Sequence, residues 1–268
     1  MMRNLKISII TASYNSVKTI EETILSVLNQ NYKNFEYIII DGGSTDGTVD
    51  IIKKYSDRLT YWVSEPDNGM YDALAKGFKR ITGDICAYIN ADDYYQKYAF
   101  EVLNEVFQND KIHWVTGINT IYNDKSQIVS VKIPYKYRKN FIVKGLYNGK
   151  NMPYIQQEST FWRSELLKTV DFVKLRQCKY AGDYYLWNCF AKKYNLDIIM
   201  SVLSGFRKHS GQLSENANAY YEEMQSIVTK KAYFWDYALG FLDRIRSGFS
   251  VRLNKEIIKY NHKNKCWE

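Results

Sequence analysis

The strongest constraint on the fold is an alternation of strand and helix patterns in the first third of the 268-residue chain. Short apolar runs with the composition of buried strands alternate with segments that read as helices. The strand runs are residues 5–11, 37–40, 61–64 and 85–89, and the helical segments are 17–28, 48–55 and 70–80. Thr19 and Glu22 fit a capping box at the start of the first helix. This alternation predicts an α/β fold with a doubly wound, mostly parallel sheet.

Polar clusters follow three of the predicted strands. They are Thr11–Asn15, Asp41–Ser44 and Asn90–Asp93. In a parallel sheet, ligands bind beyond the carboxyl ends of the strands. We therefore expect the three clusters to meet at one edge of the sheet and to form the active site there.

The remaining chain has a different pattern. A helix is expected at 97–107, β-like runs at 113–118, 120–123, 127–133 and 158–163, and a further helix from Gly182 to Tyr194. Apolar residues recur at helical spacing between Met224 and Ile245. The most plausible boundary is the polar stretch 214–218, which precedes this C-terminal tail.

Two carboxylates, Asp92 and Asp93, stand together at the end of a strand. Oxygen ligands of this kind suit Mg²⁺ or Mn²⁺, and such an ion can neutralise a diphosphate leaving group. His209, in a loop, can complete the site with Asp92. An Asp-rich turn and a lone loop histidine are also common without any function, so both interpretations stay open on these residues alone.

Asp41 and Asp183 are further candidates. Asp41 ends a strand before two glycines, where it can accept hydrogen bonds from a base or ribose while the backbone approaches closely. Asp183 stands at a predicted helix start, where it is either an N-cap or a general base facing the cleft. No G-x-G-x-x-G follows a strand and no G-x-x-x-x-G-K-[ST] occurs, which excludes the dinucleotide and P-loop fingerprints.

Taken together, these segments resemble the family-2 glycosyltransferases with the GT-A fold. The matching segments occur in the family's order and are SIITASYN to DGGSTDGT (8–48), EPDNGMYDALAKGF to NADDYY (65–95), QQESTFWRSELL (156–167), AGDYYLWNCFA (181–191) and FRKHSGQLS (206–214). The resemblance covers residues 5 to about 215. It implies a GT-A catalytic domain at 1–215, with nucleotide-sugar binding in 1–95 and the acceptor side in 96–215. A basic amphipathic helical extension is expected at 216–268.

The resemblance also implies an inverting transfer of a sugar from a nucleotide-sugar, most simply a UDP-sugar, to a hydroxyl group of a glycan. It implies a divalent cofactor, Mn²⁺ or Mg²⁺. Asp183 matches the catalytic base, and Asp92 the last acid of the D-x-D metal motif, with Asn90 in the place of its first Asp and Asp93 as a second candidate ligand. His209 matches a residue that reaches the metal or the diphosphate.

The resemblance assigns the other positions to the donor. Thr11, Ser13 and Asp41 match residues that bind the base and ribose, and Asp67 and Lys76 match donor-side residues. Gln156 and Gln157 match a pair near the reacting sugar.

Two alternatives were weighed against this prediction. A non-catalytic nucleotide-sugar or glycan-binding module can use the same fold, because a fold does not imply activity. The Asn90 substitution favours that alternative, whereas Asp92, Asp183 and His209 favour an enzyme. A nucleotidyltransferase is expected to carry a Gly-rich basic loop after the first strand, and residues 11–15 do not form one.

The net charge of +8 is concentrated in two segments. Residues 132–150 hold six Lys or Arg and no acid, and 230–265 hold nine against three acids. Such patches favour anionic partners. The expected partners are the nucleotide-sugar, a glycan or lipid-linked glycan acceptor, and an anionic membrane surface as a further candidate, but no nucleic acid; the oligomeric state is left open.

The sequence also bears on location. The cysteines at 86, 178, 189 and 266 show no C-x-x-C spacing and suit a reducing cytosol. No stretch approaches the roughly 18 apolar residues that span a bilayer. A cytoplasmic protein is expected, with two alternatives for its basic face: peripheral binding to the inner face of the membrane, or a solvated surface without a membrane role. In the tail, we expect the apolar stripe 224–245 to be buried and the basic side chains to face outward: Arg244, Arg246, Arg252, Lys255, Lys259, Lys263 and Lys265.

Overall fold

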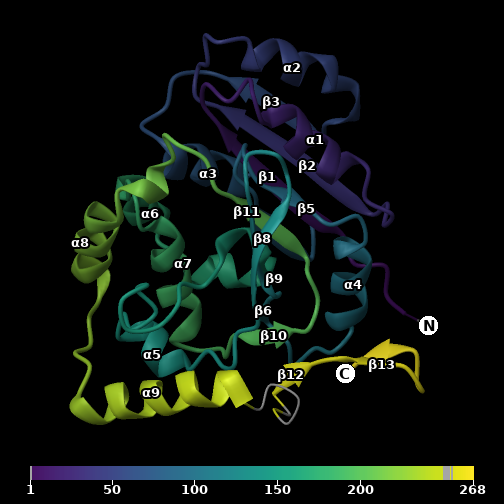
Figure 1. Ribbon diagram of the computed structural model, residues 1–268. Helices are drawn as coiled ribbons and strands as arrows, with labels where there is room; N and C mark the ends of the chain where they lie inside the picture. The colour runs from purple at the N-terminus through teal and green to yellow at the C-terminus, as the bar shows by residue number, and fades with distance from the viewer. Residues whose placement is uncertain (1, 250–253, 255) are drawn as a thin grey trace.

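The centre of the molecule is an eight-stranded sheet in the order β12-β10-β6-β9-β4-β1-β2-β3 (Figure 1). The structure is a computed structural model that describes residues 2–249, 254 and 256–268. Its strands are β1 (Ile7–Ser13), β2 (Phe35–Asp41), β3 (Tyr61–Ser64), β4 (Ile85–Tyr88), β6 (Trp114–Thr116), β9 (Thr160–Arg163), β10 (Asp197–Ile199) and β12 (Ile257–Ile258). Within this sheet, β9 runs antiparallel to β4 and β6, and the other pairs are parallel. The predicted mostly parallel α/β sheet is confirmed.

The first strands are apolar throughout because both faces of the sheet are covered. Every residue of β1 is buried. The crossover helices are α1 (Ile20–Leu28), α2 (Thr48–Lys54) and α3 (Met70–Phe78), and α3 packs on β1 and β2. The predicted capping box is wrong: Thr19 makes no side-chain cap, and the Glu22 carboxylate instead accepts a hydrogen bond from Arg207 Nη2 at 2.6 Å.

A second sheet has four strands in the order β5-β11-β7-β8. Its strands are β5 (Tyr94–Tyr95), β7 (Asn119–Tyr122), β8 (Ile128–Lys132) and β11 (Ser204–Arg207). β5 directly follows the Asp92–Asp93 turn and pairs antiparallel with β11, which ends two residues before His209. This pairing brings two clusters far apart in the sequence to the same place.

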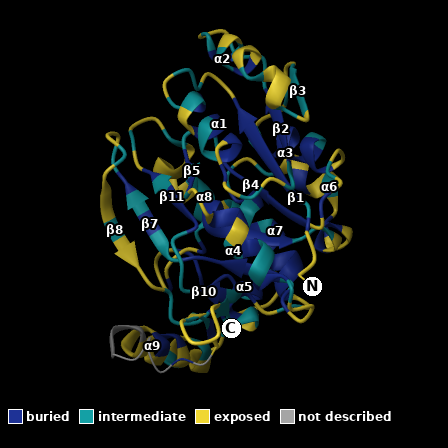
Figure 2. Cartoon of the chain, turned by 90° about the vertical axis from the view of Figure 1, so that its right-hand side faces the viewer, coloured by how far each residue is buried: buried dark blue, intermediate teal, exposed yellow. Residues whose placement is uncertain are grey.

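Helices surround these sheets. The remaining ones are α4 (Ala99–Val106), α5 (Lys139–Val143), α6 (Phe172–Gln177) and α7 (Gly182–Ala191), with short 3₁₀ turns at Ser56–Arg58, Gln157–Ser159, Ser164–Thr169 and Leu213–Glu215. Figure 2 shows that the buried residues are concentrated in the central sheet and its nearest helices. Among the described residues, no helix is long and apolar enough to cross a membrane.

The tail is not purely helical. It forms α8 (Ala217–Ile227), α9 (Phe234–Phe249), a hairpin of β13 (Tyr260–Asn261) with β14 (Cys266–Trp267), and β12, which extends the main sheet beside β10. The domain boundary at 215 stays a prediction.

The expected burial of the apolar stripe in the tail is confirmed for Met224 and wrong for α9. Trp235 is 75% exposed, and Leu239, Leu242 and Ile245 are exposed as well. The reason is that α9 turns two acids toward the protein, where Asp236 pairs with Lys144 and Asp243 with Arg138. Of the basic residues expected to face outward, Arg252 and Lys255 lie outside the described residues.

The contact of α3 with β1 depends on Gly77. A Cβ atom added there would lie 2.6 Å from Ile10 Cγ2, and Ile10 is fully buried. We predict that Gly77→Ala lowers the free energy of unfolding by about 1–2 kcal/mol, because overpacking outweighs the helix propensity that alanine adds. Urea denaturation measures this change. Lys79→Ala, at an exposed position next to the same helix, is the control, and equal stability of Gly77→Ala and wild type would contradict the packing argument.

Candidate active site

The carboxyl ends of β1, β2 and β4 meet at one edge of the sheet, as predicted. Ser13 and Asp41 are register partners, and the Asn90–Asp93 turn follows β4 on the other side of β1. Ser13 Oγ is buried and has no hydrogen-bond partner among the described residues. This orphaned hydroxyl is a polar atom that a ligand at the edge can satisfy.

Asp41 and Thr11 have partners inside the protein. The buried Asp41 carboxylate accepts hydrogen bonds from Ser44 N (2.9 Å), Ser44 Oγ (2.6 Å) and Ser64 Oγ (2.7 Å), so it holds the loop that follows β2. Thr11 Oγ1 lies 2.9 Å from the Tyr37 hydroxyl and is fully buried. In this structure neither side chain is presented to a ligand, and their contacts with a base or ribose stay predictions.

Asp67 and Lys76 lie near the Asp41 loop. A Cβ atom on Gly42 would come within 2.8 Å of Asp67 Oδ2, so the loop and this carboxylate approach closely. Burial raises the pKa of Asp67, although the Gly69 N–H and the charge of Lys76 act against this shift. Lys76 Nζ is 2.8 Å from Glu65 Oε1. A cation and a partly buried acid therefore stand close together beside the Asp41 loop, and their role toward a donor stays a prediction.

Asp92 and His209 meet, as their predicted metal role requires. His209 Nε2 is 3.0 Å from Asp92 Oδ2, and Gln212 Nε2 donates to the same oxygen at 2.9 Å. His209 Nδ1 lies 2.9 Å from the Ser210 carbonyl oxygen, so both ring nitrogens face oxygen acceptors. A neutral imidazole carries a hydrogen on one nitrogen, so it can donate to only one of these oxygens. A metal ion bound between Nε2 and Asp92 Oδ2 would remove this conflict, and a backbone carbonyl on the second nitrogen is typical of metal-binding histidines.

Asp93 does not join this pair. Its side chain is fully buried, and Oδ1 accepts a hydrogen bond from the Arg207 N–H at 2.8 Å. Burial and the neighbouring charges of Asp92 and Glu158 raise the pKa of Asp93 well above its usual value. The structure therefore does not place Asp93 among the predicted metal ligands, because its carboxyl turns toward the interior while that of Asp92 turns outward.

The predicted pair Gln156 and Gln157 is divided between two roles. Gln156 bonds both backbone atoms of Thr120 at 2.8 Å, so its amide is used in holding β7. Gln157 Nε2 donates to the Tyr88 carbonyl oxygen at 2.7 Å, while its buried Oε1 has no partner among the described residues. Gln157 is thus the better placed of the two to accept a hydrogen bond from a ligand.

Asp183 lies at the start of α7, where the tail covers it. Its Oδ1 accepts a hydrogen bond from Tyr184 N at 2.6 Å, and its Oδ2 from the Tyr220 hydroxyl at 3.3 Å. Burial raises the pKa of Asp183 to about 7, although both hydrogen bonds lower it. The helix N-cap is Ala181, so Asp183 is not the cap. A carboxyl group with this pKa is half ionised near neutral pH and suits general-base work.

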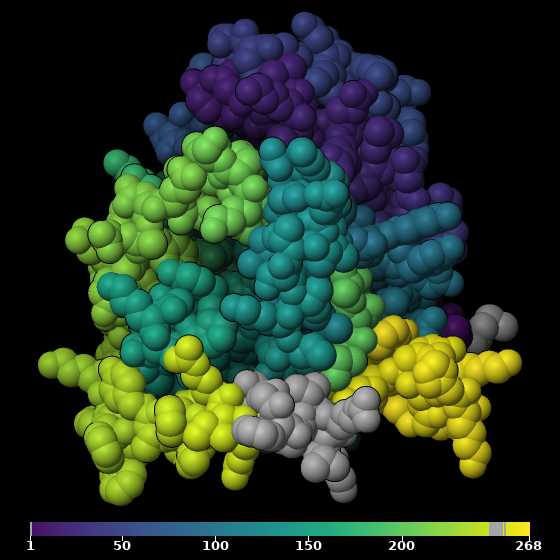
Figure 3. All heavy atoms as spheres, in the orientation of Figure 1, coloured from purple at the N-terminus to yellow at the C-terminus, as the bar shows by residue number. Residues whose placement is uncertain are grey.

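Glu158 interacts electrostatically with both Asp92 and Asp183. It is buried, and burial together with the charges of Asp92 and Asp183 raises its pKa to about 8. Glu158 is therefore a buried acid within electrostatic range of both Asp92 and Asp183. In the space-filling view, a recess opens between the light-green chain near residue 210 and the teal chain near residue 140 (Figure 3).

A divalent metal ion fits this donor set through Asp92 and His209. Adjacent ligands of an octahedral Mg²⁺ at ~2.1 Å stand about 3 Å apart, close to the distance between His209 Nε2 and Asp92 Oδ2. Across residues 2–249, 254 and 256–268, no group of three or more His, Cys, Asp or Glu side chains has metal-binding geometry. The ion would thus take its other ligands from a donor diphosphate and water, as Mg²⁺ commonly does.

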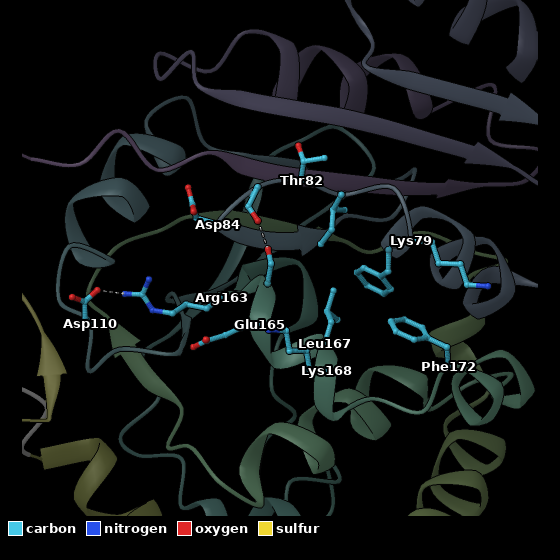
Figure 4. A pocket seen from close by; sticks show the side chains of 13 residues that line it. Lys79, Thr82, Asp84, Asp110, Arg163, Glu165, Leu167, Lys168 and Phe172 are labelled. Carbon is cyan, nitrogen blue, oxygen red and sulfur yellow. Dashed lines mark hydrogen bonds and ion pairs between the residues drawn. The ribbon is translucent and has the colours of Figure 1, made fainter.

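Another hollow, of about 780 Å³, lies at the opposite edge of the sheet (Figure 4). Its lining includes Thr82 and Asp84, which precede β4, and Arg163, which ends the antiparallel β9. The Arg163 guanidinium already donates to the carbonyl oxygens of Ile112 and Phe107 at 2.8 Å. Its other charged side chains include the exposed Lys79, Glu165 and Lys168, and none of the candidate active-site residues lines it.

Several residues of the site were not predicted from the sequence. They are Glu158, Arg207 and Gln212, which lie in matched segments without an assigned role, and Tyr71 and Tyr220, which surround Asp183. The sequence carried a signal for Gln212, three residues after His209 in the same polar loop. Tyr220 carried none, because only the fold brings α8 to α7.

The chain is similar in sequence to known glycosyltransferases. The model of glycosyl transferase family 2 matches residues 8–170. The UDP-Glc:alpha-D-GlcNAc-diphosphoundecaprenol beta-1,3-glucosyltransferase WfgD of Escherichia coli is 27% identical over 213 residues, which cover 78% of this chain and 80% of WfgD.

Solved structures share the fold. The crystal structure of S. aureus TarS 1–349 in complex with UDP-GlcNAc has a TM-score of 0.64 and 17% identity, covering 92% of this chain and 73% of that one. The mannosyltransferase PcManGT from Pyrobaculum calidifontis in complex with GDP-Man and Mn²⁺ has a TM-score of 0.56 and 17% identity, covering 91% and 70%. These likenesses confirm the predicted GT-A fold.

The raised pKa of Asp183 predicts a stability cost at neutral and higher pH. Ionising this carboxyl is harder in the folded state than in the unfolded state, so folding stability falls as the pH rises from about 4 to above 7. Asp183→Asn removes this cost. We compare the free energy of unfolding of the variant with that of wild type at each pH. We predict that this difference favours the variant by roughly 2–4 kcal/mol more at pH 8 than at pH 4.

Asp72→Asn is the control of opposite sign. Asp72 pairs with Arg176 at 2.6 Å and its pKa is lowered, so this variant is expected to lose stability above pH 4. Denaturant melts at both pH values measure the two differences, and a pH-independent difference for Asp183→Asn would contradict the buried-base argument.

Proposed function

The chain belongs to glycosyl transferase family 2, and we propose that it is an inverting enzyme that transfers a sugar from a UDP-sugar to a hydroxyl group of a glycan or lipid-linked glycan. The reaction would serve the synthesis of a cell-surface polysaccharide or glycolipid in the cytoplasm. WfgD supports this proposal by its name, since it transfers glucose from UDP-Glc to a diphosphoundecaprenol-linked sugar.

The observation that carries the proposal is the state of Asp183. Two hydrogen bonds hold its carboxyl, from Tyr184 N and the Tyr220 hydroxyl, and its pKa of about 7 lets it accept a proton at neutral pH. In the proposed reaction, the acceptor hydroxyl gives its proton to Asp183 while its oxygen attacks the anomeric carbon. The bond from that carbon to the diphosphate oxygen breaks on the opposite face, which inverts the configuration. Direct displacement of this kind needs one base.

Asp92 and His209 would hold the divalent ion, Mn²⁺ or Mg²⁺. When bound, such an ion neutralises the negative charge of the departing diphosphate. The residues around it have separate tasks: Gln212 orients the Asp92 carboxylate, and the Ser210 carbonyl fixes the His209 ring. The PcManGT complex, which contains Mn²⁺, supports a metal on this fold.

The nucleobase of the sugar donor, uracil or guanine, is the least constrained part of the proposal. TarS binds UDP-GlcNAc and PcManGT binds GDP-Man on the same fold, so the fold alone permits either nucleotide. WfgD and TarS favour UDP. Thermal unfolding with UDP, GDP and several nucleotide-sugars, each with Mn²⁺, tests this choice, because a ligand that binds only the folded state raises the midpoint.

A non-catalytic binding module is the alternative on the same fold. The Asn90 amide lies 3.4 Å from Asp93 Oδ2, so it has a structural partner in the turn. Its presence in place of an acid is therefore compatible with an enzyme. Release of UDP from the donor by purified protein separates the alternatives.

For the base, we predict that Asp183→Asn retains UDP binding and loses roughly 10²–10⁴ in transfer rate. Tyr220→Phe is expected to stay active but to need a higher pH, because the Tyr220 hydrogen bond lowers the pKa of Asp183. Rate against pH, measured by UDP release with acceptor present, reports both effects. Tyr221→Phe, next to Tyr220, is the control with an unchanged profile. An Asp183→Asn rate within threefold of wild type would remove the assignment of the base.

For the metal, we predict that Asp92→Ala abolishes the increase in UDP affinity caused by Mn²⁺, measured by calorimetry with and without the ion. Asp93→Asn is the matched control. It should retain that increase, because the Asp93 carboxyl is buried against the Arg207 N–H rather than turned to the site. The reverse pattern would move the metal role to Asp93.

A further inference from the structure

Helix α9 is docked on the protein in an unusual orientation. Asp243 accepts from Arg138 Nε at 2.6 Å and is 2% exposed, and Asp236 pairs with Lys144 at 2.6 Å. Gly240, between the two acids on the same face, lies against Met152 and Phe141. The two acids and Gly240 therefore face inward, at spacings of four and three residues.

The opposite side of α9 and the residue before it expose large apolar side chains. Phe234 is 74% exposed, Trp235 75% and Phe241 63%. The whole set, which we call the α9 platform, is Tyr233, Phe234, Trp235, Tyr237, Leu239, Phe241, Leu242 and Ile245. Monomeric soluble proteins seldom leave so many large apolar side chains together on one surface, and such patches mark interaction sites.

The exposed charged residues in the sequence from 229 to 249 are all positive. Lys230 and Lys231 precede the helix, Arg244 and Arg246 lie in its second half, and all of them are exposed. Asp236 and Asp243 are the only acids in the sequence from 229 to 249, and both are turned inward in ion pairs. The outward side thus combines aromatic and aliphatic groups with cations.

We propose that the α9 platform docks on an anionic lipid bilayer, with its apolar side chains in the interface and its cations at the headgroups. Trp, Tyr and Phe prefer the interfacial region, and Lys and Arg are attracted to acidic lipids. The helix has 16 residues and is therefore ~24 Å long. It runs along one edge of the molecule (Figure 1), and most of its surface is exposed (Figure 2), so one planar surface can contact its length.

Charge favours a bilayer over a second copy of the chain. Two copies meeting through this face would bring Lys230, Lys231, Arg244 and Arg246 of each toward one another, and like charges across an interface oppose association. An acidic bilayer complements the cations and also receives the apolar groups. This inverts the expectation from the sequence, in which the apolar stripe was buried and only charges faced the membrane.

Flotation with vesicles of phosphatidylglycerol and phosphatidylcholine, or of phosphatidylcholine alone, tests the proposal. Wild type should float with the anionic vesicles at low salt, and less at 0.5 M NaCl because salt screens the charges. The triple variant F234S, W235S and F241S should lose at least tenfold in bound fraction. The matched control removes exposed apolar groups elsewhere, through Y98S, I128S and V173S, and should float like wild type.

Circular dichroism checks that each variant is folded. Flotation does not depend on sugar transfer, so a negative flotation result leaves the proposed function untouched. No flotation of wild type at low salt, or equal flotation of wild type and the α9 variant, overturns the proposal. A concentration-dependent dimer that the α9 variant abolishes, without vesicle binding, would assign the platform to a second copy and also overturns it.

Discussion

The candidate site depends on the placement of one buried side chain, Arg207. Its backbone N–H donates to Asp93, its Nε donates to the Asp92 carbonyl oxygen at 2.8 Å, and its Nη2 pairs with Glu22 at 2.6 Å. One residue thereby joins β11, the turn after β4 and helix α1. Because His209 and Gln212 follow closely in the chain, this anchoring delivers both to Asp92. A buried guanidinium with fewer partners would lower the free energy of unfolding. Glu22 and the Asp92–Asp93 turn are therefore both constrained to positions that satisfy Arg207.

The site also concentrates acids with little compensating charge. Burial raises the pKa of Asp93, Glu158 and Asp183, and the buried Glu158 Oε1 has no hydrogen-bond partner among the described residues. Such a cluster is costly to ionise in the folded state. A cation in the recess lowers that cost, and so does protonation. The arrangement is therefore expected to be less stable than an apolar one, as acid clusters at functional sites often are.

The sequence predicted the parts of the structure that depend on local pattern. The strands, the crossover helices and the meeting of polar clusters at one edge follow from hydrophobic periodicity and from the parallel arrangement. It did not predict which of Asp92 and Asp93 faces outward, because that depends on pairing between β5 and β11. The same limit applies to the capping box: Glu22 had a suitable partner nearby in sequence but found Arg207 through the tertiary fold. The orientation of α9 was missed because helical spacing identifies an apolar face without saying what covers it.

The tail links these observations, since it supports the candidate base at one end and the α9 platform at the other. In α8, the Glu223 carboxylate accepts hydrogen bonds from Lys179 N and Tyr180 N at 2.8 and 2.7 Å, just before α7 begins. Tyr220, one turn earlier, contacts Asp183. The linker after α8 then leads to α9, whose inward acids bind Lys144 and Arg138 around α5, and α5 packs on α7. Both tail helices are thus fastened to the elements that position Asp183, so a surface that held α9 would also fix the orientation of α7 relative to that surface.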